Sequence, residues 1–468
     1  MSVKNIAVYM LARLAPAAIT MFTVYFYTNS VDPEQYGLFS KVSAIAAITY
    51  PLLFAPIWYF LLQNKSPVYQ IASNQAYSVF FVIAFLMLSA APFIYIFSSP
   101  DISKEIFAIA LMAILYGNIQ IRLEELRIDS RPKSYLILAS LRAVLILGIS
   151  FIFIKYDFHY LLSPLIDGVL TGILICILPI DIGLFKNLKF KGISRSFSLI
   201  YRYGFYLSLY SILNTMLFSI DRILIAFINS DHQAGLYSSS YDLAMKLIHT
   251  LVFSIELSML PMLLKVKNDG GSLQEQFIEN TKTYLFIMMP ITIGLVSITP
   301  SLCNLYFPED YREVAFLVFP VIAVSTFIAG FANAIYHHSY ILSGKNSKLF
   351  KIIFYVLIFN LTTNSVLDYF GDPMYSSVIA LMSFSIYSFF TYLNTVAYCQ
   401  YRFPIKFFCT ILMLCTPMIA FAIFYGFSNQ ALILIFEIFI FIFLYLSGII
   451  IFNVFQFRDK LAGRFLRL

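Results

Sequence analysis

The chain has 468 residues, of which 60% are hydrophobic, 18% aromatic and only 12% charged, and its mean hydropathy is +0.83. A soluble globular protein is much less apolar, so lipid is expected to be the solvent of most of the chain. The net charge of +7 does not indicate a nucleic-acid partner, because the basic residues lie in short loops and in the tail 457–468, as they do at a cytoplasmic membrane face.

Apolar runs recur along the whole chain, each near the roughly 20 residues that cross a hydrocarbon core of about 30 Å as a helix. They are apolar on every face, whereas barrel strands alternate apolar and polar residues, so helices are expected. The predicted spans are, in chain order, 5–28, 37–62, 75–97, 105–123, 134–155, 161–183, 203–228, 235–264, 283–300, 313–343, 352–370, 374–399, 407–426 and 431–455. The predicted fold class is an all-α polytopic membrane protein with about 14 transmembrane helices.

The first apolar run is expected to stay in the protein. Lys4, the apolar stretch after it and Ala15-Pro16-Ala17 resemble a secretory signal with a cleavage site. Arg13 would interrupt the hydrophobic region of such a signal, and the apolar run continues well past this point. A retained first helix is therefore predicted.

Charge predicts the orientation of the spans. With the N-terminus inside, about 23 of the 31 Lys and Arg residues fall in inner segments, as the positive-inside rule requires. Outer segments then hold only Lys104, Lys155 and Arg312. An error of one span early in the chain would invert every later loop, so the pattern predicts that the N- and C-termini are both cytoplasmic.

Prolines mark the places where the predicted helices are expected to bend. They are Pro16, Pro51, Pro56, Pro164, Pro179, Pro290 and Pro320. Bent helices suit a gating transporter, although they also occur in static membrane proteins.

A short internal repeat predicts two equivalent halves. Residues 35–40 read QYGLFS and residues 233–238 read QAGLYS, and both copies open the second helix of a hairpin. Spans one to six and seven to twelve would then be pseudo-symmetric lobes followed by an extra pair. The predicted organisation is an N-lobe at 1–185, a C-lobe at 186–402, a helix pair at 403–456 and a basic cytoplasmic tail at 457–468.

The sequence offers no basis for catalysis. The longest connections, near 184–202 and 265–282, are each under about twenty residues, and no Walker, GxSxG or HExxH motif occurs. The five cysteines form no CxxC pair, and His337-His338 has no companion ligands at zinc spacing. Neither a metal site nor a cofactor is expected, apart from a coupling proton or sodium ion.

Five cations fall within predicted spans, where an unpaired charge costs several kcal/mol. They are Arg13, Lys41, Arg142, Arg222 and Lys246. Each is either part of a structural ion pair or faces a hydrated cavity, where Arg and Lys would bind a phosphate or diphosphate group. We predict the second role, with Arg13 and Arg142 deepest, about 12 Å from the inner ends of their helices.

Acidic residues in the spans are candidates for ion coupling. Asp242, Lys246, His249 and Glu256 share one face of the eighth span, because their spacings of four, three and seven keep them within about 80° of arc. Asp242 and Lys246 would also simply neutralise each other as an i, i+4 pair. The candidates for a coupling proton or sodium ion are Glu256, Asp242, Asp167 and Glu437, each with a structural hydrogen bond as the alternative.

These features resemble one family. The motif Asp32-Pro33-Glu34-Gln35-Tyr36-Gly37-Leu38, the pair Asp221-Arg222 and the later Ala234-Gly235-Leu236-Tyr237 are similar to bacterial polysaccharide-unit flippases of the multidrug/oligosaccharidyl-lipid/polysaccharide (MOP) exporter superfamily. The resemblance implies a V-shaped pair of lobes around a cationic cavity, opened alternately to each side of a bacterial inner membrane. It implies as substrate an undecaprenyl-diphosphate-linked oligosaccharide such as an O-antigen repeat unit, with a polysaccharide polymerase and chain-length machinery as further partners.

Three alternatives stay open. A peptidoglycan-precursor flippase would share the fourteen helices and the cationic cavity. A multidrug exporter of the same superfamily usually has twelve helices and an acidic cluster in the first lobe, where this chain has Arg13. From a different class, a membrane glycosyltransferase or polymerase would need sizeable outer loops with acidic motifs, and the predicted outer loops are short.

Overall fold

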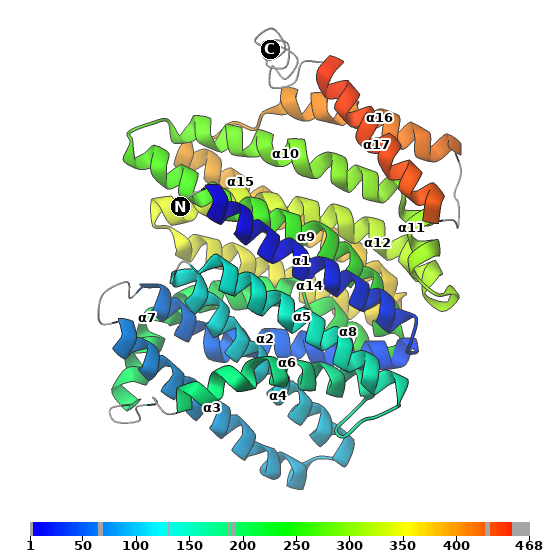
Figure 1. The fold of residues 1–468 in the computed structure, drawn as a ribbon. Helices are drawn as coiled ribbons and strands as arrows, with labels where there is room; N and C mark the ends of the chain where they lie inside the picture. The colour runs from blue at the N-terminus through cyan, green and yellow to red at the C-terminus, as the bar shows by residue number, and fades with distance from the viewer. Residues whose placement is uncertain are drawn as a thin grey trace. The chain divides into compact units, whose positions relative to one another are not determined.

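The computed structural model of the chain describes residues 3–63, 69–129, 131–185, 188, 193–425 and 431–451 (Figure 1). In these ranges the chain forms 17 α-helices, one π-helix and one 3-10 helix, and no strand. The elements are α1 (Val3–Thr28), α2 (Pro33–Gln63), α3 (Tyr69–Phe97), α4 (Pro100–Ile128), α5 (Pro132–Lys155), α6 (Pro164–Phe185), α7 (Ile193–Leu217), α8 (Ile220–Ile228), α9 (Asp231–Asn268), α10 (Leu273–Ser297), α11 (Thr299–Tyr306), α12 (Glu309–Gly330), η1 (Phe331–Tyr336), α13 (His337–Ser343), α14 (Asn346–Phe370), η2 (Pro373–Tyr375), α15 (Ser376–Cys399), α16 (Ile405–Tyr425) and α17 (Ala431–Ile451). The predicted all-α fold class is confirmed.

Each of the predicted spans coincides with an apolar helical segment. Among the described residues, eight helices are long and apolar enough to cross a membrane, and two bent helix pairs raise this number to ten if each pair is one span. Four shorter apolar helices, at Leu14–Thr28, Gln75–Ala90, Pro164–Pro179 and Ile405–Ala420, occupy the remaining predicted spans. The number of helices that cross the membrane stays a prediction.

The sharpest breaks do not fall at the prolines that were expected to bend the helices. Pro16, Pro51 and Pro56, for example, lie inside continuous helices. The chain instead bends by 51° between α7 and α8, and by 66° between α10 and α11, where Pro300 opens the second helix. Because proline has no N–H group and clashes with the preceding turn, it ends α10 rather than bending it.

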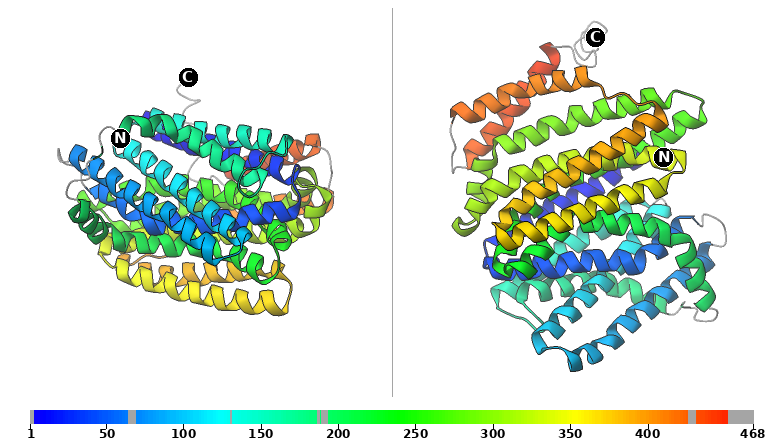
Figure 2. Two further views of the ribbon diagram at one scale, coloured as in Figure 1. Left: turned by 90° about the horizontal axis from the view of Figure 1, so that it is seen from below. Right: turned by 180° about the vertical axis from the view of Figure 1, so that it is seen from behind.

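The chain divides into two compact units. Unit 1 comprises Met1–Ser239 with Leu349–Ile379, and unit 2 comprises Ser240–Lys348 with Ala380–Leu468. Within each unit, long helices lie side by side and short connections join them (Figure 2). The lobe boundaries predicted at 185 and 402 follow the chain order and stay a prediction.

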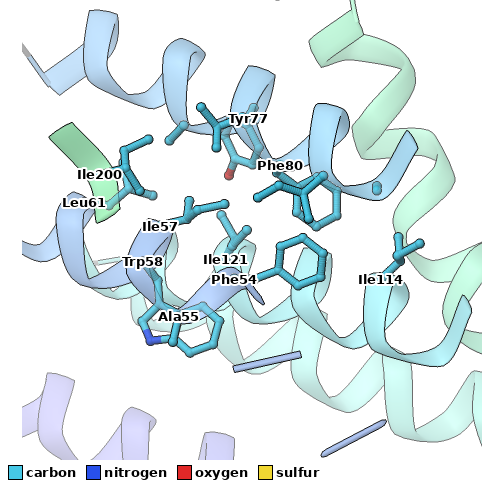
Figure 3. Packing of buried hydrophobic residues seen from close by; sticks show 14 residues of the cluster. Phe54, Ala55, Ile57, Trp58, Leu61, Tyr77, Phe80, Ile114, Ile121 and Ile200 are labelled. Carbon is cyan, nitrogen blue, oxygen red and sulfur yellow. The ribbon is translucent and has the colours of Figure 1, made fainter. Parts of the chain in front are cut away.

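Unit 1 is held together by aromatic packing and by close approach of its helices. Phe54 and Trp58 of α2 pack with Phe80 of α3 in a buried apolar cluster (Figure 3). Gly168 and Gly172 form a GxxxG pattern on α6, and a Cβ atom built on either would lie within 2.8 Å of a backbone atom of α5. Small residues at this spacing let two membrane helices approach each other closely, so α5 and α6 form one layer.

Unit 2 contains a π-helical turn inside its α12–α13 segment. η1 interrupts the predicted span 313–343, and Phe331 N–H bonds the carbonyl of Ile328, which leaves the Phe327 carbonyl free of its usual helical partner. The hydroxyl of Tyr284 on α10 donates to that carbonyl at 2.6 Å. One buried side chain thus satisfies the acceptor that the π-helix leaves exposed.

Candidate functional site

Among the predicted substrate-binding cations whose side chains the structure describes, Arg142 is the most available. It lies on α5 and is half-buried, and no described residue forms a hydrogen bond or an ion pair with its guanidinium group. Its charge acts on the Tyr50 hydroxyl of α2 and on the Cys176 thiol of α6, so the guanidinium faces these helices inside unit 1. A guanidinium group in this position has its full set of donors ready for an anion.

Aromatic rings pack around Tyr50, on which the charge of Arg142 acts. The ring of Tyr50 is 6.1 Å from the ring of Trp58 and 6.1 Å from the ring of Tyr116 on α4, measured between centroids. Trp58 is the only tryptophan in the chain. Such rings offer flat apolar faces together with polar groups at their edges. Unit 1 therefore places an available cation next to an aromatic surface.

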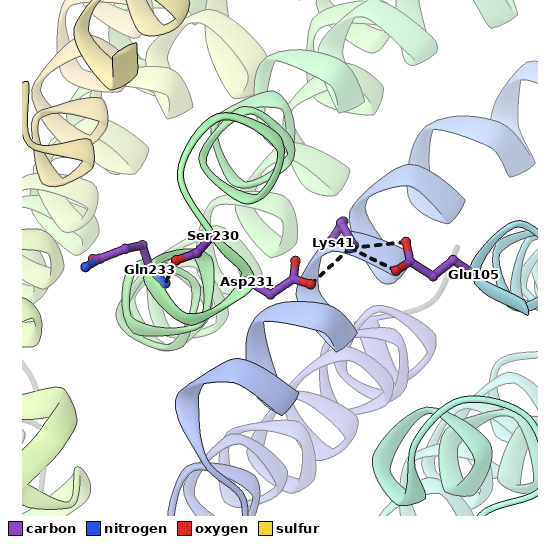
Figure 4. Close-up of polar contacts among 5 residues, drawn as sticks. All are labelled: Lys41, Glu105, Ser230, Asp231 and Gln233. Atoms are coloured by element: carbon purple, nitrogen blue, oxygen red, sulfur yellow. Dashed lines mark hydrogen bonds and ion pairs between the residues drawn. The ribbon is translucent and has the colours of Figure 1, made fainter. Parts of the chain in front are cut away.

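Lys41 is engaged by two carboxylates. Its Nζ atom lies 3.1 Å from Glu105 Oε2 of α4 and 3.1 Å from Asp231 Oδ2 at the start of α9, and only 8% of its side chain is exposed (Figure 4). The sequence left open whether this cation forms ion pairs or binds substrate. The observed geometry uses its charge within the protein.

The other three predicted cations are placed as follows. Arg222 folds back onto the break between α7 and α8, where its Nη2 atom donates to the Phe218 carbonyl at 3.4 Å and to Ser219 Oγ at 3.5 Å. Lys246 is half-buried on α9 and takes part in contacts within the protein. Arg13 falls in α1, but its side chain lies outside the described residues.

The four residues predicted to form a polar face of the eighth span lie on one helix. Asp242, Lys246, His249 and Glu256 all lie on the continuous helix α9 and are half-buried. Each takes part in contacts within the protein, and the His249 ring stacks against Phe253 with centroids 6.3 Å apart. Their role in ion coupling stays a prediction.

Two other acidic candidates have identifiable partners. One carboxylate oxygen of the buried Asp167 accepts the backbone N–H groups of Tyr160 and Leu161, both at 2.7 Å, and so holds the loop that precedes α6. Glu437 on α17 is buried and accepts a hydrogen bond from Ser301 Oγ of α11 at 3.3 Å. Both carboxylates thus have a structural use, and their role in ion coupling stays a prediction.

A buried cluster of acid and amide side chains, which we call the acid-amide cluster, lies in unit 1. It consists of Asp221 on α8, Tyr237 on α9, and Asn360, Asn364 and Asp368 on α14. Asp221 accepts from Asn364 Nδ2 at 2.9 Å and from the Tyr237 hydroxyl at 3.3 Å. Asn364 Nδ2 also donates to Asn360 Oδ1 at 3.0 Å. All five side chains are at most 2% exposed.

The acid-amide cluster has unused oxygen atoms. Asp368 accepts from Ser376 Oγ at 2.9 Å through one carboxylate oxygen. Its other oxygen and the Asn364 Oδ1 atom are buried and have no hydrogen-bond partner among the described residues. Burial disfavours the charged form of a carboxylate, and oxygen atoms are the ligands that small hard cations prefer. The cluster thus suits a proton or a small cation.

The sequence interpretation missed most of this cluster, although a signal for it exists. Asn360, Asn364 and Asp368 repeat every four residues within the apolar run 352–370 and therefore share one helix face. Asp221 had been considered only together with Arg222. The amides carry no charge, and a search for charged residues in the spans passes over them.

Solved structures of membrane transporters share this fold. The structure of the lipid II flippase MurJ, in an inward-closed conformation, superposes with a TM-score of 0.71 at 17% identity, covering 98% of this chain and 100% of that one. A MATE transporter of Vibrio cholerae, VcmN, gives 0.55 at 13% identity, covering 84% and 95%. A MOP superfamily transporter from Pyrococcus furiosus gives 0.56 at 13% identity, covering 85% and 96%. The chain is thus a multi-pass membrane protein with the fold of this superfamily.

The family of the chain is identified by a match of its sequence to a family model. A family model described as polysaccharide biosynthesis protein matches residues 31–316, more than half of the chain. The chain belongs to this family, as the resemblance predicted. A search of curated proteins finds no match.

Proposed function

We propose that the protein is a flippase that moves an undecaprenyl-diphosphate-linked oligosaccharide, such as an O-antigen repeat unit, from the cytoplasmic to the outer leaflet of a bacterial inner membrane. The observation that carries this proposal is Arg142, a half-buried guanidinium with no partner among the described residues, whose charge acts on Tyr50, a ring that packs against Trp58. The cation would bind the diphosphate, and the rings would pack against the sugars. The flipped unit would then pass to a polymerase and its chain-length machinery.

Family and fold support this assignment over an enzyme. The family model names polysaccharide biosynthesis, and the fold is shared with a lipid II flippase. A lipid-linked sugar is anionic at its head and apolar in its tail, so a membrane protein with an available cation within an apolar helix matches its chemistry. Transport of such a molecule requires no bond to be made or broken.

We further propose that ion coupling drives the cycle through the acid-amide cluster. Its unpartnered oxygen atoms on Asn364 and Asp368 suit a proton or a sodium ion, and its members come from α8, α9 and α14. A cation bound there would tie these three helices together, and its release would loosen them. The protein would thereby link the cation gradient to the exposure of the substrate site.

A peptidoglycan lipid-precursor flippase is the second candidate. The observation that favours it is the superposition on MurJ, which covers almost the whole chain at a higher TM-score than the two transporters above. The two candidates separate by complementation. Our proposal expects the gene to restore surface polysaccharide in a strain without its repeat-unit flippase, and not to rescue growth when the lipid II flippase is depleted.

The proposal is tested by changing the charge of Arg142. Arg142→Ala should reduce surface polysaccharide at least about tenfold, because a lost charge-assisted contact to a diphosphate is worth about 1.5–3 kcal/mol. Arg142→Lys should retain part of the activity, since it keeps the charge but not the bidentate geometry.

The matched control is Lys155→Ala, which removes an exposed cation from the end of the same helix. It should leave surface polysaccharide unchanged. Protein levels in the membrane are measured for every variant by immunoblot. Normal polysaccharide with Arg142→Ala at a normal protein level would remove Arg142 from the site.

A further inference from the structure

The two copies of the internal repeat pack against each other. A Cβ atom built on Gly37 of α2 would collide with the carbonyl of Asp231 and lie 2.8 Å from Gly235 N; one built on Gly235 of α9 would collide with the carbonyl of Pro33 and lie 2.9 Å from Gly37 N. Each glycine therefore faces the residue four positions before the other glycine. This reciprocity is what a local two-fold axis between the copies produces, and only glycine permits so close a contact.

Both chain segments at this contact are fixed by a side-chain cap at the helix start. Asp32 Oδ1 accepts the backbone N–H of Gln35 at 2.8 Å. Ser230 Oγ accepts the backbone N–H of Gln233 at 3.2 Å, and Figure 4 shows this second pair. These caps occupy equivalent positions in the two copies. The two capped helix ends thus meet through backbone atoms, and an added side chain at either glycine would force them apart.

Lys41 lies one helical turn after Gly37 and binds α2 to two other helix ends. Its ammonium group contacts Glu105 near the start of α4 and Asp231 at the start of α9, at 3.1 Å each. Separating α2 from α9 would remove one of the two carboxylates from this buried cation, which is strongly unfavourable. The ion pairs therefore favour the closed contact.

The contact has an open side. A cleft of about 390 Å³ is lined by residues that include Asp32, Gln35 and Asp231. Three residues after each glycine, Ser40 and Ser238 occupy equivalent positions of the two copies, and both hydroxyls are buried without a hydrogen-bond partner among the described residues. Movement of α2 away from α9 would connect these hydroxyls to the water in the cleft.

We propose that this contact is a latch that closes the outer side of the protein. The two glycines form the close helix contact, and the ion pairs of Lys41 hold it closed. The proposal rests on the proposed function, because an alternating-access flippase must close one side while it is open to the other. The predicted orientation places the starts of α2, α4 and α9 outside. When the latch opens, α2 and α9 separate and the ion pair between Lys41 and Asp231 breaks.

The latch is tested by the accessibility of Ser238→Cys. This reporter is placed in a chain whose native cysteines at 176, 303, 399, 409 and 415 are replaced by serine, and whole cells are treated with a membrane-impermeant maleimide. The closed latch should protect the reporter. Gly37→Ala should raise its labelling rate at least about tenfold, because the added methyl group forces α2 from α9 and shifts the population toward the open state.

A second variant changes charge without changing size. Glu105→Gln combined with Asp231→Asn removes both carboxylates from Lys41 and should raise the labelling rate in the same way. This double variant tests the latch even if Gly37→Ala does not reach the membrane. The matched controls are Gly148→Ala, at a glycine whose added Cβ would have no neighbour within 4 Å, and Glu279→Gln, in an exposed ion pair with Lys282.

Unchanged labelling of Ser238→Cys in both the glycine and the carboxamide variants would overturn the proposal, as would labelling only by a reagent supplied from the cytoplasmic side. The controls should label at the rate of the parent chain. Labelling does not depend on a substrate, so the latch stands or falls independently of whether the transported molecule is a polysaccharide unit.

Discussion

Arg142 and Lys41 are both cations within predicted spans, yet unit 1 uses them in opposite ways. Lys41 has two carboxylates at 3.1 Å, whereas no described residue pairs with Arg142. The sequence predicts that each of these cations is either ion-paired or faces a hydrated cavity, because burial of a lone charge in a membrane costs several kcal/mol. It does not reveal the partners, since Glu105 and Asp231 lie 64 and 190 positions away from Lys41.

The acid-amide cluster leads to a prediction about ion coupling. Asp221→Asn keeps the size of the side chain and can still contact the Tyr237 hydroxyl, but it can neither bind a proton at neutral pH nor supply a negative charge to a cation. We expect Asp221→Asn to reduce surface polysaccharide about tenfold or more, and the remaining export should no longer respond to collapse of the proton or sodium gradient. Export is followed in cells treated with ionophores selective for each ion.

Asp269→Asn is the control for this experiment, because Asp269 is an exposed carboxylate in the loop after α9. It should leave both the level of export and its gradient dependence intact. If Asp221→Asn at a normal protein level still exports polysaccharide in a gradient-dependent way, the acid-amide cluster is not the coupling site.

At the scale of the elements, hydropathy predicted the position of the helices but not where they break. Every predicted span contains an apolar helical segment, because about 20 apolar residues in lipid must satisfy their own backbone hydrogen bonds as a helix. The break before Thr299 has a sequence signal in Pro300, which was not among the prolines expected to bend the helices, whereas the break before Ile220 and the π-helix at Phe331–Tyr336 have no such signal. The π-helix has a partner from another helix, the Tyr284 hydroxyl of α10, and sequence periodicity does not report such partners.

The π-helix gives a prediction about stability. Tyr284→Phe should lower the free energy of unfolding by about 1–2 kcal/mol, because the Phe327 carbonyl loses the hydroxyl of the buried Tyr284, which donates to it at 2.6 Å. Unfolding of the purified protein in mixed micelles, titrated with sodium dodecyl sulfate, measures this change. Tyr355→Phe, at a side chain that is 67% exposed, should leave the midpoint unchanged. Equal midpoints for Tyr284→Phe and the parent would show that the hydroxyl does not stabilise the π-helix.

For the whole molecule, the internal repeat was the most informative feature of the sequence. Residues 35–40 and 233–238 match in letters, and the structure places Gly37 and Gly235 in reciprocal contact. A sequence comparison relates two segments to each other, but it does not say that they touch. The apolar runs predicted the fold class, and these motifs together with the number of spans predicted the family. The substrate did not, because the chemistry of a diphosphate-linked sugar depends on which cations remain available after folding.

The most direct measurement of the central claim is lipid flipping by the purified protein in proteoliposomes. An undecaprenyl-diphosphate-linked oligosaccharide is incorporated into both leaflets, and a sugar-modifying enzyme added outside reports how much of it reaches the outer leaflet. We predict that the protein makes nearly all of the diphosphate-linked sugar accessible within minutes in the presence of an ion gradient, and that Arg142→Ala loses this activity while Lys155→Ala retains it. If the parent protein moves no diphosphate-linked sugar, or if Arg142→Ala moves it as fast as the parent, the assignment of Arg142 as the diphosphate-binding cation of a polysaccharide-unit flippase is contradicted.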